Sequence, residues 1–320
     1  MLNPHLHRKD VQHLPMRGGF GEGLITAGKK NDQVVALTAD LSESTYVLPF
    51  AKQYPERFVQ CGVSEQNMIG TAAGLALAGK IPFAASYAVF SPGRTWDQIR
   101  VSVCYSNANV KIVGSHAGIS VGPDGATHQA MEDLAITRVI PNLTVVVPCD
   151  AIEAKKATIA LAEFVGPAYL RLARPSTPVI TTDATPFSIG KMNVLRKGND
   201  VTIIACGPLV YDALVAAEFL ATKKISAEVI NAHTLKPFDA KTLIASVSKT
   251  RCVVTAEEHQ TIGGLFGAVS ETLAREQPTP VEAIGMNDAF GESGQPGELL
   301  VKYEMTSRDI IRAVERVMKR

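Results

Sequence analysis

The 320-residue chain is long enough for about two domains, and 46% hydrophobic residues can fill two packed cores, which excludes a disordered or fibrous protein. Lysine and arginine number 32 against 31 aspartate and glutamate, so the net charge of +1 excludes strong attraction to nucleic acid or anionic lipid. Five cysteines lie scattered without a Cys-x-x-Cys spacing, which favours a reducing, cytoplasmic location.

Residues 1–16 carry charges and histidines but no apolar stretch typical of a signal peptide. We expect a flexible N-terminal tail here, with its histidines in solvent rather than on a metal. The most apolar helical run, Met68–Ala78, has 11 residues, fewer than the ~20 that cross a bilayer. The sequence therefore predicts a cytoplasmic protein without a membrane span.

Short runs typical of strands alternate with longer helical patterns from residue 33 to 172. Strands are predicted at Val34–Thr38, Phe58–Cys61, Pro82–Ser86, Val110–Gly114, Thr144–Val147 and Ala168–Leu172. Helices are predicted at Glu65–Gly79, Arg94–Tyr105, Gln129–Arg138 and Ala151–Phe164. This alternation is typical of a mainly parallel sheet with helices on both faces. In the first of these helices, Gly70 and Gly74 lie four residues apart and would let a neighbouring backbone approach closely.

A stretch rich in Pro, Thr, Ser and Gly, from Pro175 to Lys197, interrupts this pattern and indicates a domain boundary. We expect a first domain over residues 17–180, a linker over 181–198 and a smaller α/β domain over 199–320. In the smaller domain, strands are predicted at Val201–Cys206, Ala227–Asn231 and Arg251–Ala256. Its predicted helices are Val210–Thr222, Ala240–Val247, Leu265–Glu276, Glu298–Lys302 and Ser307–Met318.

Polar and aromatic residues follow the predicted strands of the first domain at their carboxyl ends. In a doubly wound sheet, ligands bind beyond these ends, where the loops converge. We therefore expect one site, formed by Asp40, Ser44, Glu65, Tyr87, Phe90, His116, Asp124, His128 and Arg174.

Glu65 opens an apolar helix, with Val63 before it and Met68 after it. One interpretation is an acid that stabilises the helix N-terminus. The other is a carboxyl group shielded from water, which would hold a proton and share it with the nitrogen of a heterocycle. Tyr87 and Phe90 likewise have two interpretations, as core aromatics or as a stacking platform for a flat ring.

The segment from His116 to Gln129 is rich in glycines that permit turns. Such turns would bring His116, Asp124 and His128 together, and these groups can transfer protons and bind sugar hydroxyls near neutral pH. A zinc site is the competing interpretation. The wide spacing of the ligands and the lack of a cysteine in this stretch argue against zinc.

At these residues the sequence resembles the transketolase family, in particular the C-terminal half of enzymes that are split into two chains. The resemblance runs from about Arg17 to the end of the chain. It rests on the segments Ala39-Asp40-Leu41, Val63–Met68, Asp124–Gln129, Val147–Asp150 and Glu257-Glu258-His259. It implies a thiamine diphosphate-binding type of α/β fold, with a pyrimidine-binding domain followed by the smaller transketolase C-terminal domain.

The resemblance also implies roles for residues near the cofactor. Glu65 would hydrogen-bond the ring nitrogen 1′ of thiamine diphosphate and so promote formation of the reactive ylide, which carries a two-carbon ketol unit from a ketose phosphate to an aldose phosphate. Tyr87 and Phe90 would stack on the pyrimidine, and Asp40 and Val63 would adjoin the cofactor. The expected setting is carbohydrate metabolism such as the pentose phosphate pathway.

For the sugar, the resemblance implies that His116 and Asp124 contact hydroxyl groups and that His128 transfers a proton. The residues expected to hold the terminal phosphate are Arg17, Ser44, His128 and Arg174. Two departures from the family pattern concern this region. Gly93 stands where a third aromatic residue usually completes the pocket wall, and Pro175 follows Arg174 in place of polar residues.

The chain lacks the Gly-Asp-Gly segment with which such enzymes hold the diphosphate through Mg²⁺. We therefore assign no metal ligands to this chain and expect an N-terminal-half subunit to hold the magnesium, in a two-plus-two heterotetramer. The chain alone should be inactive.

Three alternatives stay open. The first is the β-subunit of a 2-oxoacid dehydrogenase, although that family lacks the segment found here at Asp124–Gln129. The second is a split transketolase for an unusual sugar phosphate. The third is a non-catalytic paralogue, although Glu65 and the histidines are present.

Overall fold

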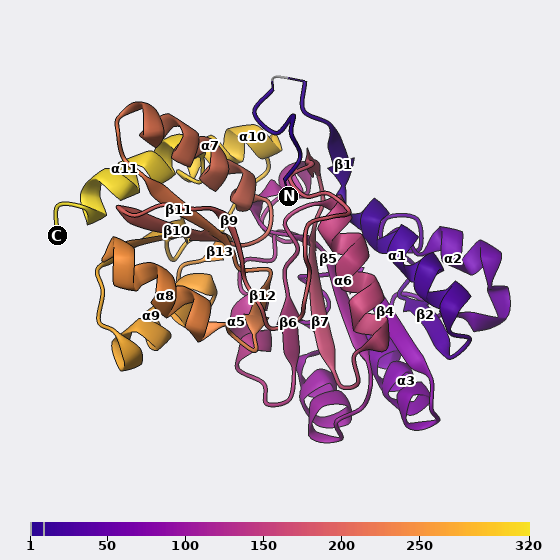
Figure 1. The fold of residues 1–320 in the computed structure, drawn as a ribbon. Helices are drawn as coiled ribbons and strands as arrows, with labels where there is room; N and C mark the ends of the chain where they lie inside the picture. Colours follow the sequence, from indigo (N-terminus) through magenta and orange to yellow (C-terminus); the bar gives the residue numbers. More distant parts are fainter. Residues whose placement is uncertain (1, 9) are drawn as a thin grey trace.

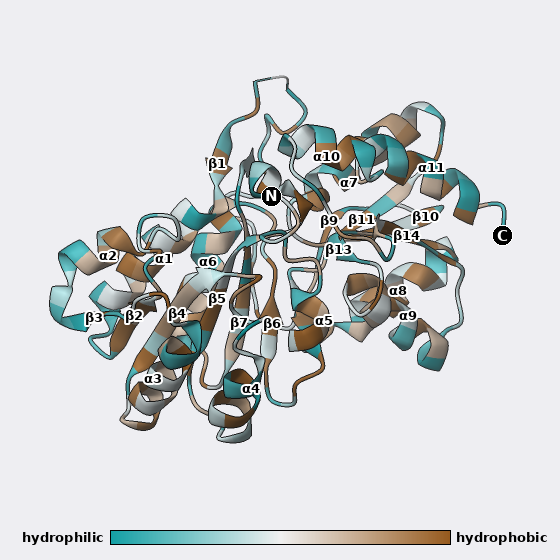
Figure 2. Cartoon of the chain, turned by 180° about the vertical axis from the view of Figure 1, so that it is seen from behind, coloured by the Kyte–Doolittle hydropathy of each residue, from teal (hydrophilic) through white to brown (hydrophobic). Residues whose placement is uncertain are grey.

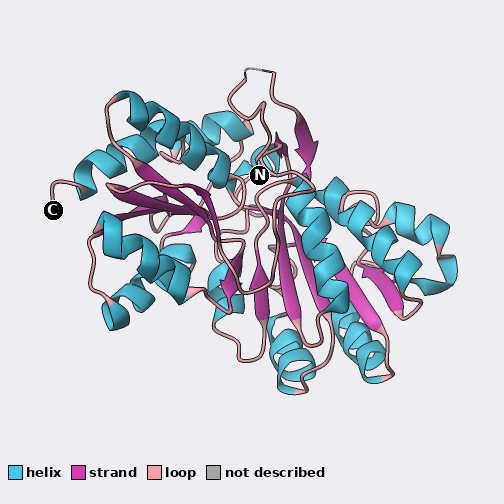
Figure 3. Cartoon of the chain, in the orientation of Figure 1, coloured by secondary structure: helices cyan, strands magenta, loops and turns pink. Residues whose placement is uncertain are grey.

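The computed structural model describes residues 2–8 and 10–320 and contains two large sheets, each flanked by helices, and a two-stranded ribbon (Figure 1). Figure 3 shows the strands of the two sheets as separate groups. The N-terminus lies between the two halves, and the C-terminus lies at the far end of the smaller one (Figure 1). The predicted fold class is confirmed.

The larger sheet has seven strands in the order β12-β6-β7-β5-β4-β2-β3. Their bounds are β2 (Val34–Thr38), β3 (Phe58–Gln60), β4 (Ile81–Tyr87), β5 (Lys111–Ala117), β6 (Thr144–Val146), β7 (Ala168–Ala173) and β12 (Thr234–Lys236). All pairs are parallel except β12 with β6. The strands β2, β5 and β7 are buried along their whole length, because helices cover both faces of the sheet.

Alternate residues of the strands face different helices. On one face, Val34 and Ala36 pack with α1 (Met16–Lys30), α2 (Leu48–Gln53) and α6 (Ala151–Glu163). On the other face, Val35 and Leu37 pack with α3 (Glu65–Leu77) and the π-helix η2 (Ile99–Tyr105). This alternation is the two-residue period of a strand.

Helix α1 was not predicted, because its glycine-rich sequence has a low helix propensity. The packing of α1 against α6 stabilises this helix despite its low propensity. A Cβ atom at Gly19 would lie 1.9 Å from the carbonyl oxygen of Ala151, so only glycine allows this close approach. Tertiary contact therefore overrides local preference in this helix.

The smaller sheet has five strands in the order β14-β13-β10-β11-β9. Its strands are β9 (Asn193–Arg196), β10 (Val201–Ala205), β11 (Ala227–Asn231), β13 (Val253–Gln260) and β14 (Val281–Met286). Helices α7 (Leu209–Thr222) and α11 (Ser307–Val317) cover one face, and α8 (Ala240–Thr250) and α9 (Leu265–Glu276) the other (Figure 1). Helix α10 (Pro296–Lys302) lies near α7 (Figure 1). Helices of both domains carry hydrophobic and hydrophilic residues side by side (Figure 2), as expected of helices that cover a sheet.

Several elements differ from the prediction. Strand β9 lies inside the expected linker, and β12 leaves the second half of the chain to join the first sheet. The helix predicted at Arg94–Tyr105 is α4 (Trp96–Gln98) followed by η2, and the helix predicted from Gln129 begins at Asp133 as α5 (Asp133–Arg138). Elements absent from the prediction also include β14, the ribbon β1 (His13–Pro15) with β8 (Ser176–Pro178), α2 and the 3₁₀ helices η1 (Pro55–Arg57) and η3 (Ile119–Asp124).

The N-terminal segment, expected to be a flexible tail, instead packs on the protein over its described residues. Leu6 and Val11 are buried, and β1 pairs with β8 in antiparallel fashion. The Asn3 side chain donates a hydrogen bond to the carbonyl oxygen of Val179 at 2.8 Å. In the described part of the chain, no helix has the length and apolar character needed to cross a membrane.

A buried ion pair of the first domain lies at the junction with the second domain. The Arg171 guanidinium in β7 donates to Asp133 of α5 at 2.7 and 3.1 Å, and Tyr169 donates to the same carboxylate at 2.7 Å. Arg171 also donates to the carbonyl oxygens of Ala130 and of Glu258 in the second domain, at 3.2 and 2.8 Å. Burial opposes the charge on Asp133, but Arg171 outweighs it and lowers the pKa of Asp133 below its ordinary value.

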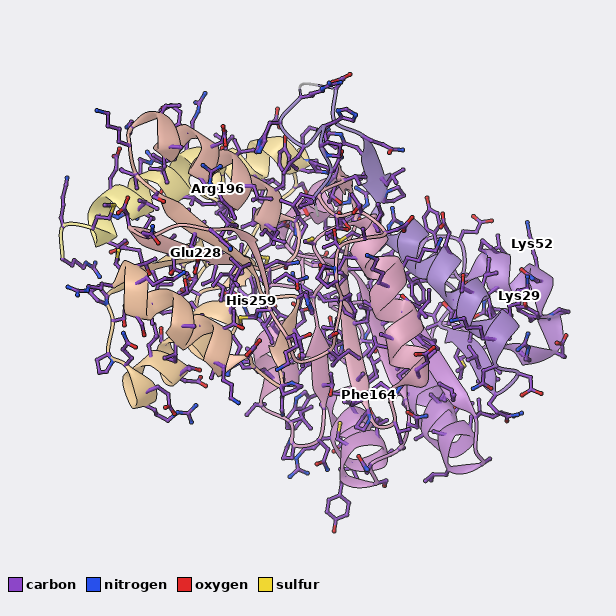
Figure 4. All side chains as sticks on the ribbon, viewed as in Figure 1. Lys29, Lys52, Phe164, Arg196, Glu228 and His259 are labelled. Atoms are coloured by element: carbon purple, nitrogen blue, oxygen red, sulfur yellow. The ribbon has the colours of Figure 1, made fainter. Side chains whose placement is uncertain are left out.

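Replacing Arg171 by methionine leaves the Asp133 carboxylate buried without its partner, and we expect a loss of about 3–5 kcal/mol in the free energy of unfolding. The matched control is Arg196→Met, which removes the exposed pair with Glu218 at 2.6 Å and should cost at most about 1 kcal/mol. Arg196 lies on the smaller domain (Figure 4). Urea unfolding of both variants measures the difference, and equal losses would contradict a special role of the buried pair.

Candidate functional site

The expected site residues gather beyond the carboxyl ends of the strands of the larger sheet. A cleft of about 510 Å³ lies there, lined by Pro15, Arg17, Ser44, Tyr46, Tyr87, His116, Asp124, Arg174, Pro175 and Ser176. The sheet register explains part of this arrangement, since Tyr87 of β4 pairs with Ser115 of β5 and so lies next to His116. The ribbon of β1 and β8 supplies Pro15 and Ser176 to the wall.

Glu65 lies beside this cleft at the start of α3, and 2% of it is exposed. Its Oε2 accepts a hydrogen bond from the Arg94 guanidinium at 3.0 Å, and Ser86 donates to Oε1 at 3.5 Å. The carboxylate is therefore shielded from water, but it contacts the positive charge of Arg94. The sequence interpretation of Glu65 did not include Arg94.

Arg94 covers one side of the aromatic pair. Its guanidinium lies 4.5 Å from the centre of the Phe90 ring, and half of the side chain is exposed. A Cβ atom at the preceding Gly93 would lie 2.2 Å from the carbonyl oxygen of Val89, so this backbone leaves no room for an aromatic side chain. Arg94, the residue after the position where the resemblance led us to expect a third aromatic, thus covers the Phe90 ring.

Four rings form one connected cluster. Tyr87 stacks on Phe90 at 5.8 Å and on His116 at 3.9 Å, while His128 meets Phe90 edge-on at 5.3 Å. Tyr87 and Phe90 are half-buried rather than core residues. Ring faces at the rim of a cleft can receive a flat, partly apolar ligand.

His116 is buried in β5 with a positive φ of 57°, a conformation that is costly for a residue other than glycine. Its Nε2 lies 3.5 Å from the Arg17 guanidinium, and its Nδ1 lies 2.7 Å from the Ser115 hydroxyl. Because arginine only donates, Nε2 acts as the acceptor and Nδ1 carries the proton. Burial, followed by the charges of Arg17 and Arg174, lowers the pKa of His116 to about 3, so the imidazole is neutral at pH 7.

Arg17 and Arg174 form the cationic end of the cleft. Arg17 donates to the carbonyl oxygens of Ser44 and Arg174 at 2.5 and 2.9 Å, and Arg174 donates to that of Val121 at 2.9 Å. Within the described residues, neither guanidinium has a carboxylate partner. Burial lowers the pKa of Arg17, and the charge of Arg174 acts in the same direction. Two adjacent cations without a counter-charge favour an anionic ligand.

Asp40, Val63 and Asp124 are exposed. Asp124 lines the cleft, whereas Asp40 and Val63 are not among the described residues that line it. The Asp40 backbone N–H donates to the Gln60 side chain at 2.7 Å, and 76% of Val63 is exposed. His128 belongs to the ring cluster, and its Nδ1 lies 2.9 Å from the Thr127 hydroxyl.

Sequence reasoning missed Tyr46, which lines the cleft and lies below the Arg17 guanidinium, 5.4 Å from ring centre to carbon. Its position two residues after Ser44 was the available signal. Across residues 2–8 and 10–320, no group of three or more His, Cys, Asp or Glu residues could hold a metal ion. The site therefore combines a buried acid, a ring cluster and a pair of arginines.

The chain is similar to known proteins along most of its length. Residues 12–179 match the model of the transketolase pyrimidine-binding domain, and residues 190–310 match that of the transketolase C-terminal domain. The putative transketolase C-terminal section of Methanocaldococcus jannaschii is 48% identical over 308 residues, 95% of this chain and 96% of that protein. The 6-deoxy-6-sulfo-D-fructose transketolase subunit SqwH of Clostridium sp. (strain MSTE9) is 43% identical, with 95% of each chain covered.

Among solved structures, a split gene transketolase described as an inactive beta4 tetramer superposes with a TM-score of 0.90. Its sequence is 46% identical, and the match covers 96% of this chain and 99% of that chain.

The buried neutral state of His116 predicts a pH dependence of stability. The unfolded chain takes up a proton at this residue near pH 6.5, but the folded chain does so only near 3, so the contribution of His116 is present above pH 6.5 and lost as the pH falls. Between pH 7 and 5, the parent should lose about 1–2 kcal/mol more unfolding free energy than His116→Asn. Denaturant unfolding at both pH values measures this, and equal losses would show that folding leaves the protonation of His116 unchanged.

Proposed function

The chain belongs to the transketolase family, and on this premise we propose that it is the C-terminal subunit of a split transketolase that moves a two-carbon ketol unit between sugar phosphates. The observation that carries the proposal is the placement of the buried Glu65 and the aromatic pair beside a cleft with two unpaired arginines. One part of this arrangement suits a heterocyclic cofactor, and the other suits an anionic sugar.

The residues of the first part fit the aminopyrimidine of thiamine diphosphate. A buried carboxyl group can share a proton with a ring nitrogen, and the half-buried Tyr87 and Phe90 offer faces to a flat ring. Glu65, Tyr87 and Phe90 would hold the cofactor, with Asp40 and Val63 beside it. When bound, thiamine diphosphate supplies a nucleophilic carbon and takes up the electron pair released as the donor sugar breaks.

The task of Glu65 in this proposal is to keep a proton at its carboxyl oxygen against the ring nitrogen. In this structure the Arg94 guanidinium donates to Oε2 of the same carboxyl group at 3.0 Å. Since half of the Arg94 side chain is exposed, it can leave this oxygen without opening the core. Ser86 lies fully buried behind Glu65 and limits the directions in which the carboxyl group can turn.

The second part of the site suits the sugar. Neutral His116 can accept a hydrogen bond at Nε2, while Asp124 and His128 can bind or exchange protons with hydroxyl groups. Arg17 and Arg174, with Ser44, would hold the terminal anionic group. The relative named for 6-deoxy-6-sulfo-D-fructose favours a second candidate, a transketolase for an unusual sugar with a sulfonate in place of phosphate. Both groups present anionic oxygens to a guanidinium.

The missing parts of the site support a partner subunit. The chain has no Gly-Asp-Gly segment, and the described residues offer no metal-binding cluster, so the diphosphate and Mg²⁺ would be held by an N-terminal-half subunit. On α3, a Cβ atom at Gly70 or Gly74 would meet nothing within 4 Å, so the backbone expected to approach these glycines would belong to another chain. The solved relative described as an inactive tetramer of β chains supports a two-plus-two assembly in which the β chain alone is inactive.

The chain is mixed with its N-terminal-half subunit, thiamine diphosphate, Mg²⁺, a ketose phosphate and an aldose phosphate. We expect transfer of a two-carbon unit to the aldose phosphate, measured by chromatography of the sugar products. Omitting the partner should abolish transfer. Turnover of pyruvate with a lipoyl acceptor would identify a 2-oxoacid dehydrogenase subunit, and binding without turnover a non-catalytic paralogue. Transfer only from a sulfonated or other unusual sugar would identify the second candidate.

In the assembled enzyme, Glu65→Gln should slow hydrogen–deuterium exchange at the reactive carbon of the cofactor by about 10²–10⁴-fold, because the amide cannot supply the acid proton. The matched control is Asp124→Asn, which lies in the sugar cleft and should leave this exchange unchanged while raising KM for the sugar. NMR of the quenched cofactor measures the exchange. Parent-like exchange in an assembled Glu65→Gln enzyme would remove Glu65 from the proposed role.

A further inference from the structure

The loop over residues 118–128 connects His116 to His128 and carries Asp124, so all three expected sugar contacts depend on its shape. It contains η3 and turns at Gly118 and Gly122, whose φ values are 88° and 82°. A loop with such turns needs external contacts to hold one conformation. Its contacts come to a large extent from the second domain.

Gln129 ties this loop to the second domain from one side. Its Nε2 donates to the carbonyl oxygens of Ile119 and Gly122, each at 3.3 Å, and to that of Glu292 at 2.9 Å. The side chain is buried, and a Cβ atom at Gly291 would lie 2.0 Å from its Oε1. The segment that precedes α10 therefore closes tightly over Gln129.

Glu258 supports the loop from beneath. It lies buried in β13, and its Oε2 accepts a hydrogen bond from the Ser120 backbone N–H at 3.1 Å. A Cβ atom at Gly118 would lie 2.5 Å from the same oxygen, so the loop backbone rests directly on this carboxyl group. The backbone carbonyl of Glu258 is in turn fixed by Arg171 at 2.8 Å. The Ser120 hydroxyl and Glu258 Oε1 are both buried at this contact, and neither has a hydrogen bond of good geometry to another described residue.

We infer that Glu258 and Gln129 are positioning residues through which the second domain holds the sugar-binding loop in its working conformation. The inference rests on the proposed function for the identity of the ligand. It assigns to the C-terminal domain a part in sugar binding, although none of its side chains lines the cleft.

The neighbouring Glu257 provides a matched control. Adjacent residues of a strand point to opposite faces, and Glu257 faces α9, where it accepts hydrogen bonds from the backbone N–H groups of Leu265 and Phe266 at 2.6 and 2.8 Å. It is as buried as Glu258 and has no hydrogen bond to the loop. A change at Glu257 therefore disturbs a buried acid of the same strand without touching residues 118–128.

Hydrogen–deuterium exchange of the full chain, followed by mass spectrometry, tests the inference without any sugar. Glu258→Ala and Gln129→Met should each speed amide exchange in residues 118–125 about tenfold, because each loses a hydrogen bond to the loop. Exchange in β10 and β11 should stay as in the parent. Glu258→Gln, whose amide oxygen can still accept from Ser120, should restore slow exchange, and Glu257→Gln should affect only the start of α9.

In the assembled enzyme, Glu258→Ala and Gln129→Met should raise KM for the ketose phosphate about tenfold with kcat changed less than about twofold, since they weaken positioning rather than chemistry. Glu257→Gln should leave KM unchanged. The inference is wrong if the loop of folded Gln129→Met exchanges as slowly as in the parent. It is also wrong if loop exchange rises as much in Glu257→Gln as in Glu258→Ala or Gln129→Met. If Glu258→Ala does not fold, Gln129→Met decides the test. If the assembled parent lacks transketolase activity but Glu258→Ala and Gln129→Met still show faster loop exchange, the proposed function is wrong and the positioning role of these residues stands.

Discussion

The arrangement of both domains depends on one buried charge pair, Arg171 with Asp133. Taking two charges out of water is costly, and such a pair is stable only if its remaining hydrogen bonds are satisfied. Here Tyr169 donates to the carboxylate, and the guanidinium donates to Ala130 and to the backbone of Glu258. His259, the next residue, lies near the centre of the molecule (Figure 4), where its Nε2 accepts the backbone N–H of Ala135 at 3.3 Å. Arg171 thus ties β7 and α5 of the first domain to β13 of the second.

Strand β7 leads from this pair to Arg174 in the cleft, and the cleft shows the signs of a site shaped for a ligand rather than for stability. Tyr46 and His116 both have positive φ values, a cost that surrounding structure must offset. The guanidinium groups of Arg17 and Arg174 donate hydrogen bonds to carbonyl oxygens, and neither has a carboxylate partner among the described residues. His116 is kept neutral beside them. An anionic ligand would relieve this concentration of positive charge, which is consistent with a sugar phosphate.

Local sequence patterns predicted most of the fold, because strands buried on both faces need continuous apolar runs. The strand at Val34–Thr38 has the predicted bounds, and the predicted helix at Glu65 begins at that residue. Helix α1 and strands β9 and β12 could not be predicted, since their formation depends on partners distant in the sequence. The same holds within the site. The positions of Arg174, His116 and Asp124 after predicted strands indicated that they share one cleft, but only the folded structure shows that Arg94 contacts Glu65.

The short strand β12 has a consequence for how the chain can be divided. It belongs to the second half of the sequence but covers β6, the outer parallel strand of the larger sheet. A fragment that stops at the linker would leave the backbone N–H and C=O groups of β6 bare, and such an open edge recruits strands from other molecules. Truncation there would yield an aggregating piece rather than an isolated domain, so evolution or engineering could exchange the two halves only together with this strand.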